Sequence, residues 1–218
     1  TEIYTLSLHD ALPIFSSGVT QINILVGTII ASFQAGAVSY LYYADRVYQI
    51  NLAVAGIAVG TVMLPELSKH VKNNSSEQIN NLQNRALELC LFLSLPAATA
   101  LVLASEEIIT SLFGYGSFNN VSVINTAFAL TFVAFGVPAF SILKILSNFF
   151  FARNDTKTPF YLSVVSVTLN IIISVSLFGR FGFVIIPIAT SISSWIHVFM
   201  YYYFITKRDL HIFDSQFI

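Results

Sequence analysis

Charged side chains are scarce in this chain. Only 10% of its 218 residues are Asp, Glu, Lys or Arg, whereas soluble domains carry roughly 25%. This scarcity excludes an ordinary soluble domain, and the balance of 10 basic against 11 acidic residues gives no reason to expect a nucleic-acid partner. A single cysteine, Cys90, excludes an internal disulfide and a cysteine-rich metal site.

Apolar residues take the place of the missing charges. They make up 56% of the chain, which contains 20 Phe and 10 Tyr, and the mean hydropathy is +0.75. Runs of about 20 apolar residues mark membrane-spanning helices. We therefore predict an all-α, polytopic membrane helix bundle, with six spans at about 19–38, 47–65, 86–104, 121–151, 159–178 and 183–205.

The two ends of the chain lie outside this pattern. Residues 1–14, TEIYTLSLHDALPI, match the translation of a common sequencing-adapter oligonucleotide, so we interpret them as a non-native assembly scar. The alternative is a genuine short N-terminal tail. The transmembrane lobe of six helices would then be 15–206, and 207–218 a truncated cytoplasmic tail of a longer protein.

Lysine and arginine are unevenly shared between the two predicted faces of the membrane. One face receives seven: Lys69, Lys72, Arg85, Arg153, Lys157, Lys207 and Arg208. The other face receives Arg46 and Arg180, together with Glu106 and Glu107. Because short cytoplasmic loops carry the excess of Lys and Arg, we expect both ends of the chain in the cytoplasm. We also expect a capping box at Ser75–Gln78 that starts an amphipathic helix on the cytoplasmic surface.

Polar side chains recur at helical spacing along most of the spans. The first span carries Asn23 and Gln34; the fourth carries Ser141, Lys144 and Asn148 just past Pro138, a predicted kink; the fifth carries Asn170; and the sixth carries His197. Each polar group alone could be a helix–helix hydrogen bond, and Lys144 could extend to the membrane surface. Taken together, the stripes favour helices around a polar cavity.

Two adjacent charges, Asp45 and Arg46, stand between the first two predicted spans. We expect Asp45 to be the N-cap of the second span, where its carboxylate meets the positive end of the helix. Arg46 would then lie near the outer end of the cavity, where a guanidinium can hold phosphate oxygens in a bidentate manner. The simpler alternative is a helix cap followed by an interfacial arginine.

Four motifs follow one another along the chain: YLYYADRVYQ at 40–49, GIAVGTVMLPELSKH at 56–70, LFGYGSFN at 112–119 and FARNDTKTP at 151–159. In this order and spacing they resemble the MurJ (MviN) family of lipid II flippases, within the multidrug/oligosaccharidyl-lipid/polysaccharide exporter superfamily. The resemblance implies fourteen spans in two lobes, of which this chain would hold the first six of the second lobe. It also implies that Asp45 and Arg46 line the central cavity and that Ser39 lies near an outer gate. The chain departs from the family at 50–53, where Ile-Asn-Leu-Ala replaces the usual Leu-Pro-x-Gly.

The resemblance implies a flippase that moves lipid II from the cytoplasmic to the outer leaflet of the bacterial inner membrane by alternating access. Its partners would be lipid II, membrane lipids and the missing N-terminal lobe, with no cofactor and no metal. The candidate cavity residues are Arg46, Asp45, Lys144, Asn23, Gln34, Ser141, Asn148 and Asn170, with Ser39 at the gate. The alternatives are a polysaccharide-lipid or multidrug exporter and, more remotely, an intramembrane enzyme. A drug exporter would favour acids inside the spans, and an enzyme needs positioned acid, base or nucleophile groups that no motif here supplies.

Overall fold

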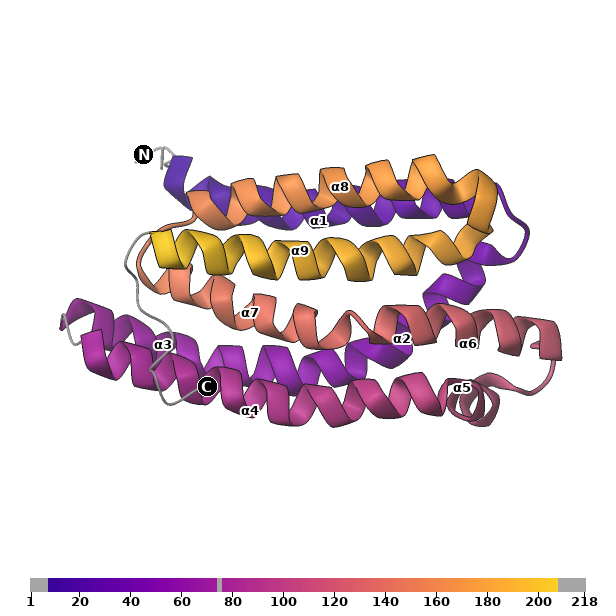
Figure 1. Cartoon of the computed structure of the whole chain (residues 1–218), viewed down its shortest axis with the longest axis horizontal. Helices are drawn as coiled ribbons and strands as arrows, with labels where there is room; N and C mark the ends of the chain where they lie inside the picture. Colours follow the sequence, from indigo (N-terminus) through magenta and orange to yellow (C-terminus); the bar gives the residue numbers. More distant parts are fainter. Residues whose placement is uncertain (1–7, 74–75, 208–218) are drawn as a thin grey trace, which may run out of the picture.

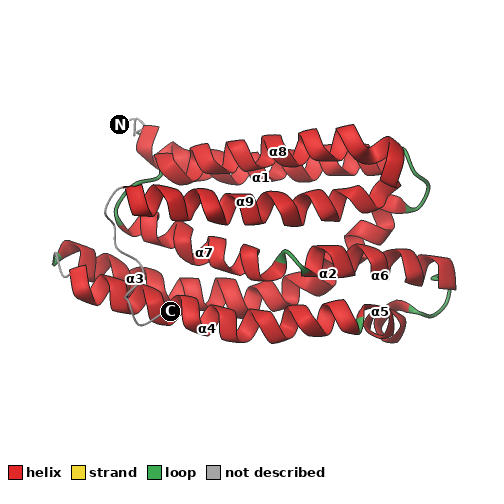
Figure 2. Cartoon of the chain, in the orientation of Figure 1, coloured by secondary structure: helices red, strands yellow, loops and turns green. Residues whose placement is uncertain are grey.

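The computed structural model describes residues 8–73 and 76–207, and almost all of them are helical. The elements in chain order are α1 (Leu8–Ser32), α2 (Ala37–Leu52), the π-helix η1 (Ala53–Ala58), α3 (Val59–Lys72), α4 (Ser76–Leu103), α5 (Ser105–Phe113), α6 (Asn120–Ala134), α7 (Val137–Ala152), α8 (Lys157–Phe181), the 3₁₀ turn η2 (Gly182–Val184) and α9 (Ile185–Lys207). Figure 2 shows helices joined by short loops in the described part of the chain, so the predicted all-α class is confirmed.

The long helices lie along one common direction (Figure 1). Helix α8 packs between α1 and α9, while α4 packs against α3 and α7, and α2 packs against α6. Two apolar clusters hold the bundle together at opposite ends. One gathers residues of α2, α6 and the start of α9, such as Ala44, Leu130 and Ile185. The other gathers α3, α4 and α7, such as Leu67, Leu87 and Phe149.

Several helical stretches have the length and composition of membrane spans. Among the described residues, Ala37–Lys72, Glu77–Leu103 and Lys157–Lys207 qualify, and α6 and α7 qualify only when the pair, bent by 44° at its break, is taken as one span. The stretch Lys157–Lys207 folds back at Gly182, whose φ is +63°, so α8 and α9 run side by side (Figure 1). Large apolar side chains face outward, including Val62, Phe92 and Leu103, each at least 74% exposed. The outer surface therefore matches a hydrocarbon environment, and the chain is an integral membrane protein.

The first two helices depart from their predicted bounds. The chain turns at residues 33–36, where Gly36 has a φ of +79°, and not at 39–46. Asp45 is consequently inside α2, whose N-cap is Gly36, so the prediction that Asp45 caps the second span is wrong. The physical reason is that 37–52 contains no glycine or proline to end a helix, and the two charges stand on its polar side.

Other predictions fall partly outside the described residues or shift by a few positions. Residues 8–14 of the expected scar belong to α1, while 1–7, Ser75 of the expected capping box and 208–218 lie outside the described residues. The predicted kink occurs at 135–136, and Pro138 instead occupies the first turn of α7, where proline is tolerated.

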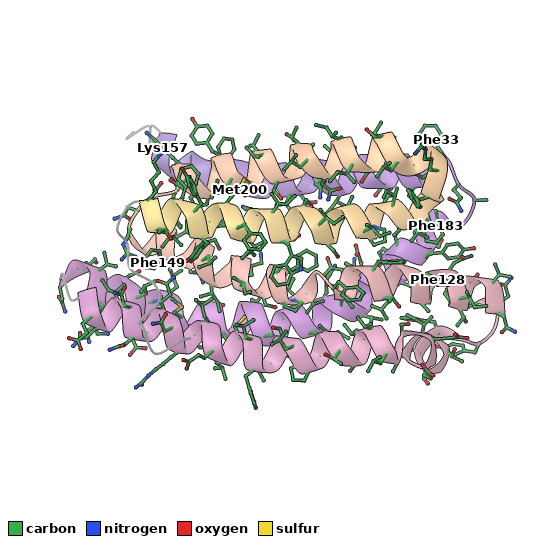
Figure 3. The ribbon with its side chains drawn as sticks, viewed as in Figure 1. Phe33, Phe128, Phe149, Lys157, Phe183 and Met200 are labelled. Atoms are coloured by element: carbon green, nitrogen blue, oxygen red, sulfur yellow. The ribbon has the colours of Figure 1, made fainter. Side chains whose placement is uncertain are left out.

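The basic side chains are unevenly distributed along the bundle axis. The ends of α3, α7 and α9 and the start of α8 lie at the left of Figure 1, and Figure 3 labels Lys157 at that end. The basic residues there include Lys69, Lys72 and Arg153. Phe33 and Phe183 are labelled at the opposite end, where α5 contributes Glu106 and Glu107. The asymmetry of the sequence thus becomes an asymmetry between two ends of the bundle.

Candidate functional site

A cavity of about 780 Å³ lies between α1, α2, α7, α8 and α9. Its wall carries polar side chains from each of these helices, including Asn23, Asp45, Arg46, Gln49, Lys144, Ser163, Asn170 and His197. Helices α2 and α7 contribute the charged side chains of the wall, whereas α8 and α9 contribute mainly hydroxyls and amides. Five of the predicted cavity residues therefore share one cavity: Asn23, Asp45, Arg46, Lys144 and Asn170.

Arg46 stands on the cavity wall about 13 Å along α2 from Ala37, if each residue adds its usual helical rise. Its guanidinium carbon lies 4.6 Å from the centre of the Tyr42 ring, one turn earlier in the same helix. A cation over an aromatic face is held in place without being neutralised. The guanidinium thus keeps its hydrogen-bond donors for a partner, while Asp45, half-buried beside it, supplies the carboxylate of the wall.

Lys144 is the second cation of the cavity. It is exposed and comes from α7, where its Cγ lies 3.5 Å from the place that a Cβ on Gly56 would take. Gly56 follows Arg46 by ten residues along one continuous helical stretch. By the usual helical rise, the backbone of Arg46 therefore lies about 15 Å along the bundle axis from Gly56, the residue that Lys144 approaches.

Ser141 and Asn148 share the stripe of Lys144, but they contact a neighbouring helix and are not among the residues that line the cavity. The Cα of Ser141 lies 3.1 Å from the position of a Cβ on Gly56, and Asn148 Nδ2 donates a hydrogen bond of 2.8 Å to the carbonyl of Gly60. The small-residue face of Gly56 and Gly60 permits this close approach. Ser141 through its backbone and Asn148 through its side chain contribute to the contact between α7 and the α2–α3 stretch.

Two side-chain hydrogen bonds join α8 to α9, while most other hydroxyls of the two helices bond to their own helix. Asn170 Nδ2 donates to Thr190 Oγ1 at 3.1 Å across the pair, and within α8 Ser174 Oγ donates to Asn170 Oδ1 at 3.2 Å. Ser166 Oγ donates to the Ser193 carbonyl at 3.1 Å. These bonds hold α8 and α9 together within the membrane and leave fewer free groups for a ligand than the stripes alone suggest.

Gln34 and Ser39 lie at the end of the bundle that carries α5, away from the cavity wall. The Oε1 of Gln34 accepts a hydrogen bond of 2.8 Å from the backbone N–H of Phe183, which ties the α1–α2 turn to η2. Ser39 is exposed in the first turn of α2. The family resemblance implies that Ser39 lies near an outer gate, which would then be at this end of the bundle.

The sequence analysis missed Gln49 and Tyr42 among the residues that line the cavity, and it recognised His197 only as part of a stripe. Gln49 follows Arg46 by three residues and Tyr42 precedes it by four, so helical spacing around Arg46 could have identified both. His197 is buried, its Nε2 has no hydrogen-bond partner, and its ring stacks on Tyr201 with the centres 5.0 Å apart. Among residues 8–73 and 76–207, no group of three His, Cys, Asp or Glu side chains could hold a metal ion.

Comparison with known proteins shows which family shares this arrangement. The family model described as "Lipid II flippase MurJ" matches residues 8–218. The chain belongs to the MurJ family. Two curated MurJ relatives, each described as "Probable lipid II flippase MurJ", come from Rhizobium meliloti (strain 1021) and Rickettsia prowazekii (strain Madrid E). The first is 42% identical over 87% of this chain and the second 38% over 90%, but the chain spans only 36% and 39% of their lengths.

A solved MurJ structure agrees with this assignment, and a second solved structure shares the fold. The structure titled "Lipid II flippase MurJ, inward closed conformation" superposes with a TM-score of 0.82 at 29% identity, over 90% of this chain and 42% of that one. An outward-facing multidrug resistance MATE transporter shares the fold at 18% identity, with a TM-score of 0.79 over 95% of this chain and 48% of that one. In both cases the chain spans less than half of the solved protein.

Proposed function

We propose that this chain is the second lobe of a two-lobed flippase that moves lipid II from the cytoplasmic to the outer leaflet of the bacterial inner membrane. The observation that carries the proposal is the pair Arg46 and Lys144 in one intramembrane cavity of a MurJ-family chain. An ionisable group within a membrane span costs at least about 2.5 kcal/mol and is typical of a transport pathway. Two such groups of the same sign favour an anionic cargo.

The charge of the cavity wall supports lipid II over a cationic drug. The cavity places two cations, Arg46 and Lys144, against one carboxylate, Asp45, so its net charge is positive. Arg46 would hold the pyrophosphate through its planar fork, and Lys144, whose neighbour Gly56 lies about 15 Å further along the axis, would hold a second anionic group such as the acidic peptide. Asp45 would offset part of this charge, so that the cargo is released as well as bound.

The remaining candidates have supporting roles in this proposal. Asn23 and Asn170 would give the cavity wall its polar surface, whereas Ser141 and Asn148 keep α7 in register with the α2–α3 stretch. Gln34 and Ser39 would lie at the outer gate, where the α1–α2 turn meets η2. No cofactor and no bond chemistry is required, because the reaction moves a lipid and breaks no covalent bond.

The same geometry supports a proposed orientation and a proposed mechanism. The end that carries Lys69, Lys72, Arg153 and Lys157 would face the cytoplasm, which puts both ends of the chain there and Glu106 outside. The missing first lobe would close the other side of the cavity, and the two lobes would rock against each other to expose it alternately to each leaflet. The lipid tail would stay in the bilayer outside the cavity.

Complementation tests the role of the lobe. The two-lobed protein should restore growth to a bacterial strain depleted of its own flippase, whereas residues 8–218 alone should not, because they form only one wall of the cavity. Membrane abundance of both proteins is measured by immunoblot. Growth supported by residues 8–218 alone would contradict the two-lobe proposal, and failure of the abundant two-lobed protein would contradict the lipid II cargo.

A further inference from the structure

The motif LFGYGSFN at 112–119 contributes nothing to the cavity wall, although the sequence analysis singled it out. It forms the end of α5, a turn and the start of α6, at the end of the bundle opposite Lys157 (Figures 1 and 3). Gly114 is required at this turn, because a Cβ there would lie 2.5 Å from the Thr110 carbonyl oxygen. The turn brings the rings of Phe113 and Phe118 to a centroid distance of 6.2 Å.

The ring of Tyr43, from α2, contacts both of these phenylalanines. Its centroid lies 4.8 Å from that of Phe113 and 5.1 Å from that of Phe118, with the second pair edge to face at 83°. We call Tyr43, Phe113 and Phe118 the aromatic clasp. One turn earlier in α2, Tyr40 packs on Phe183 of η2 at 5.6 Å. The first two turns of α2 are therefore held by aromatic contacts to two different loops.

The clasp lies one helical turn from Arg46. Tyr43 precedes Arg46 by three residues, and the neighbouring ring of Tyr42, 5.9 Å from that of Tyr43, is the one over which the guanidinium of Arg46 stacks. A continuous series of contacts thus runs from the α5–α6 loop through Tyr43 and Tyr42 to the cation. Aromatic pairs have preferred geometries, so this series fixes the rotation of α2 about its own axis as well as its position.

We propose that Tyr43 is a positioning residue: the aromatic clasp of Tyr43, Phe113 and Phe118 couples the α5–α6 loop to α2 and sets where the guanidinium of Arg46 stands in the cavity. This proposal rests on the function proposed above only in naming the cargo that Arg46 meets. It gives LFGYGSFN a role at a distance from the cavity, and it explains why three tyrosines stand at 40, 42 and 43, directly before the charged pair.

Cysteine labelling in the two-lobed protein tests the positioning directly, with the buried Cys90 replaced by Ala. Arg46→Cys and, separately, Lys144→Cys are labelled with a water-soluble maleimide, with and without Phe118→Leu. We expect Phe118→Leu to change the labelling rate at position 46 by about threefold or more, the value of a lost aromatic pair, and to leave the rate at position 144 unchanged. Tyr115→Leu, in the same loop but 73% exposed, is the matched control and should change neither rate.

Transport of lipid II gives the second readout. Tyr43→Leu should lower the transport rate about three- to tenfold at normal membrane abundance, and Tyr43→Phe, which keeps the ring, should restore most of it. An unchanged labelling rate at position 46, an equal change at position 144, or an equal loss for Tyr43→Phe and Tyr43→Leu would overturn the proposal. Labelling requires no lipid II, so a selective change at position 46 in a protein that does not move lipid II would support the clasp and contradict the proposed cargo.

Discussion

Gly56 is the position where a single added methyl group should disturb the cavity most clearly. A Cβ at Gly56 would lie 3.1 Å from the Cα of Ser141 and 3.1 Å from Leu52 Cδ1. The Leu52 side chain can turn aside, but the Ser141 contact is with backbone, so α7 itself must move away from η1. Overpacking of this kind costs about 1–3 kcal/mol. We therefore expect Gly56→Ala to destabilise the protein by about that amount.

The displacement should also reach the cavity, because Lys144 Cγ lies 3.5 Å from the same Cβ position. Gly179→Ala is the matched control, since a Cβ at Gly179 meets nothing within 4 Å and alanine is the better helix former. The assay is thermal unfolding of the purified two-lobed protein in detergent, followed by its transport rate. Equal unfolding temperatures for Gly56→Ala and Gly179→Ala would refute the close contact between η1 and α7.

Three further predictions concern orientation, the second cation and the helix contact. In intact cells, cysteines introduced at positions 72 and 157 should react with a membrane-impermeant maleimide only after the membrane is permeabilised. A cysteine at position 106 should react from outside. Labelling of position 72 from outside would reverse the orientation. Lys144→Met should lower transport more than membrane abundance, because the residue lines the cavity, whereas a parallel fall of both would make it a packing residue. Asn148→Ala should lower stability by about 0.6 kcal/mol, the mean value of a hydrogen bond between membrane helices, and an unchanged unfolding temperature would show that the bond to the Gly60 carbonyl contributes nothing.

The helices that sequence predicted best are those whose ends carry strong local signals. Helices α8 and α9 lie close to their predicted bounds, because Thr158-Pro159 opens the first and Gly182 separates the two. The α1–α2 turn was misplaced, because only Gly36 marks it and Phe33 beside it is 79% exposed and apolar. The charged residues Asp45 and Arg46 suggested a break between the first two spans, although a charged residue can lie within a membrane helix that faces a polar cavity.

The polar stripes show a second limit of the sequence. Periodicity correctly puts Ser141, Lys144 and Asn148 on one face of α7, but it does not say which neighbour that face meets. Only the packed structure shows that Gly56 and Gly60 approach Ser141 and Asn148 while Lys144 reaches the cavity. The aromatic clasp was equally out of reach, since its rings come from segments about seventy residues apart in the chain.

The transport rate of Arg46 variants tests the central claim most directly. The two-lobed protein is reconstituted in vesicles, and the movement of fluorescent lipid II across the bilayer is compared with that of a neutral fluorescent lipid. Hydrogen bonds to a charged group are worth about 1.5–3 kcal/mol, so Arg46→Ala should slow lipid II about 10- to 100-fold, and Arg46→Lys should be intermediate because it lacks the planar fork. An unchanged lipid II rate in Arg46→Ala, or an equal loss for the neutral lipid, would contradict a cationic cavity that recognises a pyrophosphate.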